Sequence, residues 1–166
     1  MRVRQLLALL GIAVFAAACG PDTKTEPNTD ANTRLGRPNP GTSWQDFTNT
    51  ARNGYADRVF FDTDAHDIRP DQEPVIRAWA EWLRAHNGAV FLVEGHADER
   101  GTREYNLGLG ARRATSVRNH LTSLGVEANR VRTLSYGKER PAEAGSTDDA
   151  WAKNRRGVAV PSGPGS

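Results

Sequence analysis

The chain contains 166 residues and has a formal net charge of +2, with 22 lysines and arginines against 20 aspartates and glutamates. Arg2 and Arg4 are the only charged residues before Cys19, so the remainder has 22 − 2 = 20 basic residues against 20 acidic ones. Because that remainder is formally neutral, its composition argues against nucleic acid as a partner.

The first twenty residues, MRVRQLLALLGIAVFAAACG, predict an export signal, because two arginines precede an apolar run too short to span a bilayer. The single cysteine, Cys19, cannot form an internal disulfide. The run resembles a bacterial lipobox with Ala16 where leucine is usual. This resemblance implies a lipoprotein signal peptide over residues 1–18, lipidation of Cys19 and, because Gly20 is not the aspartate that retains lipoproteins at the inner membrane, an outer-membrane anchor. An ordinary signal peptide, with an incidental thiol, is the alternative.

Composition divides the rest of the chain. Residues 19–42 are rich in proline, glycine, asparagine and threonine and almost free of apolar side chains, which predicts a flexible tether. Residues 43–56 form a lead-in, and residues 57–160 have a length suited to one modest domain with one core. We expect residues 161–166 to be a disordered tail, because Pro161 and the glycines after it should end the last strand.

Strand and helix patterns alternate within the domain. Short runs of strand-forming residues predict four strands, at 57–62, 89–95, 130–137 and 155–160. The helical spacing of apolar residues predicts two helices and a short helical turn, at 70–88, about 104–125 and 147–154. Asp71 is the expected cap of the first helix and Gly88 its expected end. The order predicts an α/β fold, more closely an α+β sandwich, with two main helices packed on a mixed sheet of about four strands.

The second helix is expected to place Arg113 on its buried face. At about 100° per residue, Arg113 lies within roughly 40° of Val117 and Leu124, whereas Arg112 points about 140° away from Val117. A buried guanidinium needs a carboxylate, which the protein or a ligand can supply. These residues leave two alternatives equally open, a ligand site and an internal ion pair with Asp98, Glu94 or Asp64.

Other features near Arg113 favour a ligand. Gly108 and Gly110 each cost about 1 kcal/mol inside a helix, which suggests that something approaches the backbone closely. Asp98 lies in a loop directly before a helix N-terminus, where free N–H groups favour an anion. Three more carboxylates, Asp62, Asp64 and Asp67, follow the first strand. Carboxylates on one side and a fork-shaped cation on the other suit a zwitterion such as an amino-acid head group.

Four segments, VFFDTDAHDI, VEGHADERGTREYNLGLGARRA, SYGKERPA and KNRR, resemble in order and spacing the peptidoglycan-associated lipoproteins, the Pal branch of the OmpA-like family. The resemblance implies a domain that binds the meso-diaminopimelate of the peptidoglycan stem, with Asp98 taking the ammonium and Arg113 the carboxylate. It also implies supporting roles for Asn106 and Arg156, and further ligand contacts at Asp64, Thr63 (where relatives usually have Phe), Arg100, Thr102 and Leu109.

The same resemblance implies a periplasmic domain on an outer-membrane lipid anchor. TolB and other Tol components would be its partners, and its role would be envelope constriction at cell division, without cofactor, metal or catalysis. Two other functions stay open, an OmpA-like lipoprotein of a different envelope complex and a metal-dependent wall hydrolase using the His96, Asp98 and Glu99 of HADE. The second is weakly supported, because His-x-Asp lacks a third ligand at a defined spacing. Trp79 and Trp82 are expected in the core rather than as a sugar-binding platform.

Overall fold

The computed structural model describes residues 43–45 and 57–162. The expected signal peptide, Cys19, the tether, most of the lead-in and residues 163–166 lie outside the described residues. Within the described ranges, no helix combines the length and the apolar character needed to cross a membrane.

The described residues form a four-stranded mixed sheet with three α-helices. The sheet order is β1-β4-β2-β3, in which β4 runs antiparallel to β1 and β2, and β2 runs parallel to β3. In chain order the elements are β1 (Arg58–Phe60), α2 (Glu73–Ala85), β2 (Val90–His96), α3 (Arg103–Ser123), a 3₁₀ turn (Ala128–Arg130), β3 (Val131–Gly137), α4 (Asp148–Asn154) and β4 (Arg156–Ser162). The predicted α+β architecture is confirmed, with α4 as a third, short helix.

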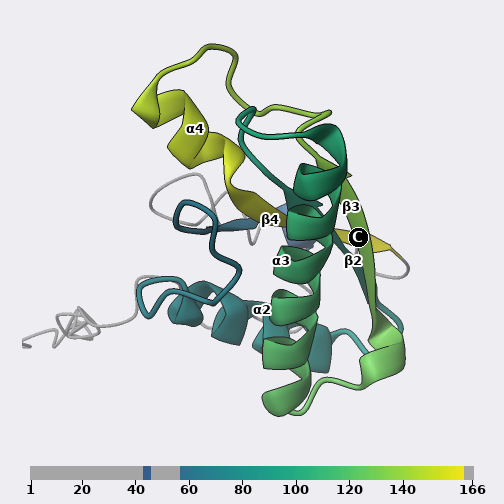
Figure 1. Ribbon diagram of the computed structural model, residues 1–166. Coiled ribbons are helices and arrows are strands. Elements are labelled where there is room, and N and C mark those ends of the chain that lie inside the picture. The colour runs from purple at the N-terminus through teal and green to yellow at the C-terminus, as the bar shows by residue number, and fades with distance from the viewer. Residues whose placement is uncertain (1–42, 46–56, 163–166) are drawn as a thin grey trace, which may run out of the picture. The chain divides into compact units, whose positions relative to one another are not determined.

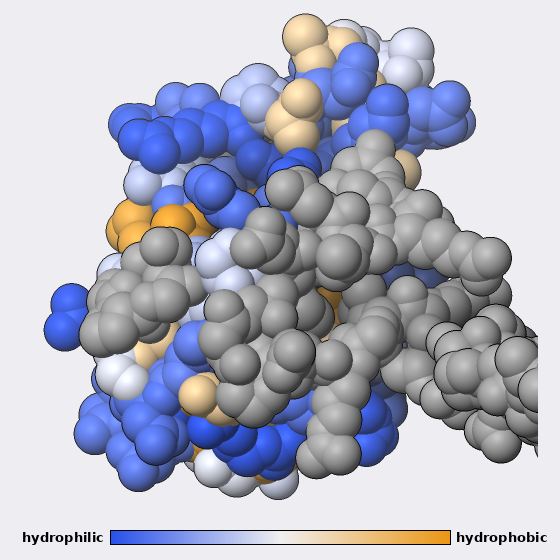
Figure 2. Space-filling view, turned by 180° about the vertical axis from the view of Figure 1, so that it is seen from behind, coloured by the Kyte–Doolittle hydropathy of each residue, from blue (hydrophilic) through white to orange (hydrophobic). Residues whose placement is uncertain are grey.

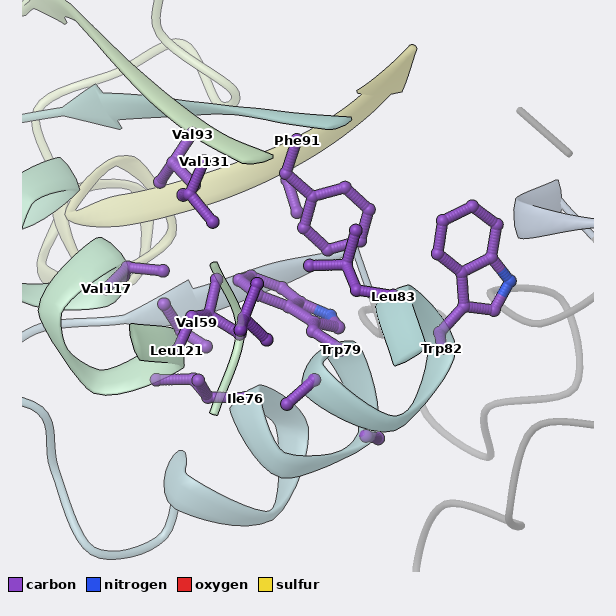
Figure 3. Packing of buried hydrophobic residues seen from close by; sticks show 14 of the residues in the cluster. Val59, Ile76, Trp79, Trp82, Leu83, Phe91, Val93, Val117, Leu121 and Val131 are labelled. Carbon is purple, nitrogen blue, oxygen red and sulfur yellow. The ribbon is translucent and has the colours of Figure 1, made fainter. Parts of the chain in front are cut away.

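The hydrophobic core fills the space between one face of the sheet and the two long helices (Figures 1 and 3). Phe91 and Val93 of β2 point to this face because alternate strand residues share a side. Trp79 and Trp82 of α2 have no exposed surface, so their predicted place in the core is confirmed. Trp44 packs edge-on against Phe91 at 4.8 Å between ring centroids, and thereby joins residues 43–45 to the core.

The opposite face of the sheet carries the alternate strand positions. Leu134 of β3 and Val160 of β4 are about two-fifths exposed there. Figure 2, the view from behind, shows mostly hydrophilic side chains where the described residues are visible, with apolar ones in a few small areas. The asymmetry matches an antiparallel or mixed sheet that buries a single face.

Helix α3 approaches the sheet most closely at Gly110. A Cβ atom at this position would lie 2.7 Å from the Gly95 carbonyl oxygen and would also meet the Ser135 hydroxyl, so only glycine fits. Among the described residues, a Cβ atom at Gly108 would meet only Arg112 Nη1, at 3.5 Å, within the same helix. The expectation of a close approach is therefore confirmed for Gly110, whereas no other described element approaches Gly108.

The ends of α2 differ from the expectation. The helix begins at Glu73, its N-cap is Gln72, and Asp71 instead accepts from Arg69 Nε at 2.9 Å. The prediction that Asp71 caps the helix was wrong, because its carboxylate is occupied by the ion pair with Arg69. At the other end the helix stops at Ala85, three residues before Gly88. The His86 ring stacks on Trp82 at 4.1 Å and its Nδ1 lies 2.8 Å from the Trp82 carbonyl oxygen, which turns the chain early.

Strand β4 continues through Pro161 to Ser162, two residues past the predicted domain end at residue 160. The Ala159 N–H donates to the Asp57 carbonyl on the β1 side at 2.8 Å, and alternate residues direct their N–H groups to the same side. The N–H that Pro161 lacks would therefore point away from β2, so its absence does not interrupt the pairing of β4 with β2. The expectation that proline ends the strand was wrong because pairing with β2 continues to Ser162 opposite Val90.

Candidate functional site

The site residues meet at one edge of the sheet. β1, β2 and β3 run in the same direction, so their carboxyl ends share an edge with the start of the antiparallel β4. Two loops lie at this edge, residues 61–65 after β1 and residues 97–102 between β2 and α3. The second loop can turn tightly because Gly101 has a φ of +87°, a conformation that suits glycine.

Asp98 is a buried carboxylate that already has cationic partners. Its side chain accepts from the Arg100 backbone N–H (3.1 Å), from Arg100 Nε (3.1 Å) and from Arg100 Nη2 (2.7 Å). Arg155 Nη1 lies 3.5 Å from the second carboxylate oxygen. Burial alone would raise the pKa of Asp98, but the hydrogen bonds and charge of Arg100 outweigh burial and hold that pKa below its ordinary value. The carboxylate is therefore ionised at neutral pH although only 7% of the residue is exposed.

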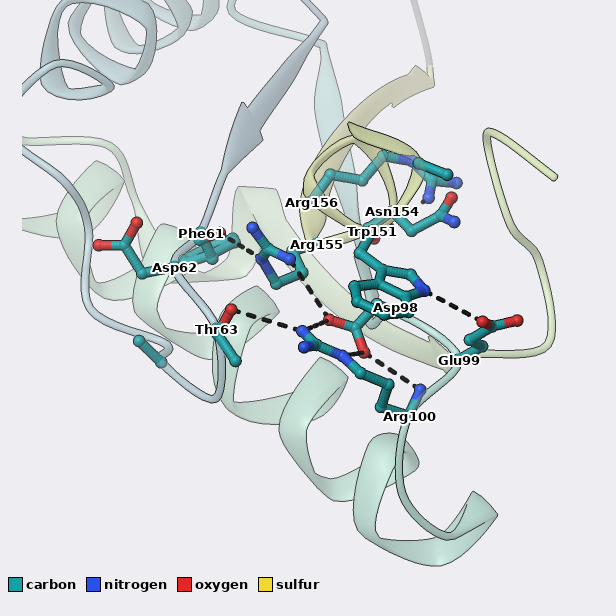
Figure 4. A network of polar contacts seen from close by, with 12 residues as sticks. Phe61, Asp62, Thr63, Asp98, Glu99, Arg100, Trp151, Asn154, Arg155 and Arg156 are labelled. Carbon is teal, nitrogen blue, oxygen red and sulfur yellow. Dashed lines mark hydrogen bonds and ion pairs between the residues drawn. The ribbon is translucent and has the colours of Figure 1, made fainter. Parts of the chain in front are cut away.

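The Arg100 side chain bridges three segments of the chain (Figure 4). Besides pairing with Asp98, its Nη2 lies 3.4 Å from Thr63 Oγ1, and its guanidinium stacks on the Trp151 ring at 4.3 Å. Trp151, on α4, also donates its indole N–H to Glu99 at 3.0 Å. Trp151 was not among the expected site residues, because nothing local to α4 indicates contact with a loop about fifty residues earlier.

The two arginines of the KNRR segment point in different directions (Figure 4). Arg155 donates to the Phe61 carbonyl at 3.1 Å and extends toward Asp98. Arg156, the expected supporting residue, instead donates to the Arg140 carbonyl at 3.1 Å, and burial lowers its pKa to about 10. Neighbouring residues at the start of a strand face opposite sides, and this alternation is the signal that could have identified Arg155.

Arg113 is completely buried, as its helical position predicts, while Arg112 is exposed. Its guanidinium donates to three backbone carbonyls, those of Ala65 (2.8 Å), His96 (2.8 Å) and Asp62 (3.0 Å). It thereby joins the loop after β1 to the end of β2. Burial lowers the pKa of Arg113 to about 10, against the opposing effect of the nearby Asp98 charge, so the side chain remains charged at neutral pH.

None of the three carboxylates offered as internal partners forms an ion pair with Arg113 in the described part of the chain. Peptide carbonyls supply the negative end of every hydrogen bond that this guanidinium makes there. The internal ion pair was therefore the wrong alternative, because the loops turn three carbonyl oxygens inward where a carboxylate was expected. The ligand alternative stays a prediction.

The remaining expected residues surround the start of α3. Thr102 is the N-cap of α3 and accepts from the Tyr105 N–H at 3.2 Å. Asp64 has a φ of +57° and accepts a hydrogen bond from the Tyr105 hydroxyl, a contact that the sequence did not indicate. Asn106, 2% exposed, donates to the Arg100 carbonyl at 2.7 Å and so supports the loop. Leu109, in the second turn of α3, is buried, with 4% of its surface exposed.

His96 belongs to the interior. It is 2% exposed, and neither ring nitrogen makes a hydrogen bond of normal geometry within the described residues. Burial, reinforced by the charge of Arg156, lowers the pKa of His96 to about 3, while contact with the Arg140 backbone opposes the shift. The described ranges contain no group of three or more His, Cys, Asp or Glu side chains arranged to hold a metal ion.

Comparison with known proteins shows the family to which the chain belongs. The OmpA family model matches residues 60–155. The peptidoglycan-associated lipoprotein of Mesorhizobium japonicum is 44% identical over 161 residues, which cover 95% of this chain and 93% of the relative. The protein of the same name from Rhizobium meliloti is 45% identical over 163 residues, which cover 97% of this chain and 89% of the relative.

Solved structures show the same fold. The crystal structure of the peptidoglycan-associated lipoprotein from Burkholderia pseudomallei has a TM-score of 0.62 and 38% identity, and the match covers 63% of this chain and 89% of that chain. The C-terminal domain of Helicobacter pylori MotB has a TM-score of 0.58 and 24% identity, over 64% of this chain and 84% of that chain, a likeness of fold. The domain thus has the OmpA-like fold. The chain belongs to the OmpA family and, within it, to the peptidoglycan-associated lipoproteins.

Proposed function

We propose that the domain binds peptidoglycan non-covalently through the meso-diaminopimelate of the stem peptide, with Asp98 as the partner of its ammonium and Arg113 as the partner of its carboxylate. The observation that carries the proposal is the pairing of Asp98. Its buried, ionised carboxylate is matched mainly by the side chain of Arg100, which is 41% exposed and can therefore move away. Relatives named for association with peptidoglycan support the same ligand.

Binding is then an exchange of partners. The ligand ammonium replaces Arg100 on Asp98, and the displaced guanidinium becomes free to meet the ligand carboxylate. Arg113 reaches that carboxylate when one of its carbonyl partners, Asp62 or Ala65, moves aside, so the loop after β1 adjusts on binding. The exposed Thr63, Asp64 and Thr102 provide further contacts, and Leu109 supports the site from beneath.

Asp98→Asn tests the proposal. The variant keeps the shape of the side chain but removes the charge that pairs with the ammonium, so we expect the full-length protein in detergent to lose about 2 kcal/mol or more of binding, roughly 30-fold. The measurement is pull-down of purified sacculi together with titration of a muropeptide that carries free diaminopimelate. Asp67→Asn is the matched control, because Asp67 follows β1 nearby and its side chain is 94% exposed.

The ligand can be varied as well as the protein. Wall that carries lysine in place of diaminopimelate lacks the second carboxylate, and amidation neutralises it, so both should bind poorly. Native affinity of Asp98→Asn for diaminopimelate wall, or equal affinity of the wild type for lysine wall, would contradict the assignment.

We also propose that Cys19 carries the lipid that holds the protein at the outer membrane, with the domain facing the periplasm. Acyl chains contribute about 0.8 kcal/mol per buried CH₂, so several chains anchor firmly. The Cys19→Ser protein should be lost from the outer-membrane fraction, as measured by membrane fractionation after a high-salt wash. Gly20→Asp keeps the cysteine and should instead move the protein to the inner membrane. Retention of Cys19→Ser in the washed outer membrane would refute the anchor.

The cellular role that family membership supports is the Tol system. We propose TolB and other Tol components as partners, and envelope constriction at cell division as the process. The alternative is an OmpA-like lipoprotein that binds the wall for a different envelope complex. Co-purification of the protein with a periplasmic β-propeller protein would support the Tol role, and capture of other envelope proteins alone would favour the alternative.

A further inference from the structure

The loop that carries Asp98, residues 97–102, accepts hydrogen bonds from Lys138, which has no part in the proposed exchange of ligand partners. Lys138 directly follows β3, and its ammonium donates to the carbonyls of Gly101 (2.7 Å) and Glu99 (3.1 Å). The carbonyl between these two, that of Arg100, accepts from Asn106 at 2.7 Å. Side-chain donors therefore bind three consecutive carbonyls of the loop.

These contacts set the direction of the loop's peptide groups. With its carbonyls held by Lys138 and Asn106, the loop keeps the turn in which the Arg100 N–H donates to Asp98 at 3.1 Å. Gly101 supplies the left-handed residue that this turn needs. A carbonyl released from Lys138 could rotate toward Asp98, where its negative end would oppose the carboxylate or compete for a cation.

The backbone before Lys138 is itself firmly placed. Gly137 lies so close to α3 that a Cβ atom there would be 2.8 Å from the Leu107 backbone nitrogen. The Gly137 carbonyl also accepts from the Ala97 N–H at 2.8 Å, at the start of the loop. The Lys138 ammonium is thus attached to a part of the chain that contacts both the beginning of the loop and the helix after it.

We infer that Lys138 is a positioning residue for ligand binding at Asp98. It acts through the carbonyls of Glu99 and Gly101, without touching the ligand, and keeps the Asp98 loop in its binding geometry. The inference rests on the proposed function for its effect on affinity, whereas the effect on the loop can be measured without a ligand.

The test uses the full-length protein in detergent and the muropeptide that carries free diaminopimelate. Lys138→Met keeps the apolar stem but removes all three donors, so we expect affinity to fall about tenfold, the loss that goes with hydrogen bonds from a charged donor. Lys138→Arg keeps donors that can reach two carbonyls and should restore most of the affinity. Lys153→Met removes an equal charge from α4, where Lys153 pairs with Glu143 at 3.3 Å, and should bind as the wild type does.

Amide hydrogen exchange separates this inference from the proposed function. In the ligand-free protein, Lys138→Met should speed exchange of the Arg100 amide about tenfold while the urea midpoint of global unfolding stays near that of the wild type. Wild-type exchange at Arg100 in this variant, or an undiminished affinity beside a wild type that binds, would overturn the inference. A wild type that does not bind the muropeptide would overturn the proposed function instead, and the exchange rate would still decide whether Lys138 holds the loop.

Discussion

Arg113→Ala should lower the free energy of unfolding by about 3–5 kcal/mol, because it removes a buried side chain and the donor of three carbonyls, one buried and two partly buried. The carbonyls of Asp62, Ala65 and His96 come from two different segments, and in the described structure the guanidinium is the group that joins them. The loss is a large part of the 5–15 kcal/mol that holds a typical domain folded. Urea unfolding followed by tryptophan fluorescence measures it, since Trp79 and Trp82 are completely buried.

Arg112→Ala is the control for this experiment. Arg112 is the exposed neighbour of Arg113, and its guanidinium lies 5.9 Å from the Tyr105 ring centroid, so its loss should change stability by no more than about 0.5 kcal/mol. Arg113→Lys should remain costly, because one ammonium cannot reproduce the planar fork that reaches three carbonyls. A loss below about 1 kcal/mol for Arg113→Ala would contradict this account. A folded Arg113→Lys protein that binds sacculi at native affinity would remove Arg113 from the proposed ligand partners.

Acid should destabilise the domain through His96, by about 2 kcal/mol between pH 7 and pH 5. The folded pKa of His96 is about 3 against an ordinary value of 6.5, because burial disfavours the charged ring. Between these two values the unfolded chain binds more protons than the folded one, so stability falls as the pH falls below 6.5. The contribution is fully present above pH 6.5 and is lost progressively toward pH 3.

His96→Leu should remove this pH dependence. The ring nitrogens make no normal hydrogen bond in the described structure, so an apolar side chain of similar size leaves no new polar group unsatisfied there. His66→Asn, at a histidine whose side chain is 42% exposed, is the control and should keep the wild-type slope. The measurement is urea unfolding at several pH values between 5 and 7, and equal slopes for wild type and His96→Leu would show that another group is responsible.

The elements of the domain could be predicted from the sequence because their signals are local. The spacing of Val117 and Leu121 on α3 defines a buried stripe, and Arg113 falls on it by helical geometry alone. Asp98 could be found for a similar reason, since the sequence places it between a strand predicted to end at Gly95 and a helix N-terminus. The fold class followed from the order of these elements.

The partners of these residues could not be predicted in the same way. Whether Arg113 meets a carboxylate or peptide carbonyls depends on how two loops turn. The direction of a loop carbonyl has no sequence pattern from which it could be predicted. The contact between Trp151 and Arg100 depends on where α4 packs, far along the chain. Which of Arg155 and Arg156 extends toward Asp98 depends on the phase of β4, and a one-residue change in the strand start would reverse it.

The pairing of Arg100 with Asp98 also means that the negative charge of the carboxylate is neutralised within the protein before a ligand binds. A simple cation that approaches Asp98 must displace the Arg100 guanidinium, which is hydrogen-bonded to the carboxylate and stacked on Trp151. Such a cation has no anionic group that could pair with the displaced guanidinium. A ligand in which an ammonium and a carboxylate lie close together pairs with both the Asp98 carboxylate and the Arg100 guanidinium. The site should therefore select zwitterionic ligands over simple cations. Because one set of ion pairs replaces another, few counterions are taken up or released, and the affinity should vary only weakly with ionic strength.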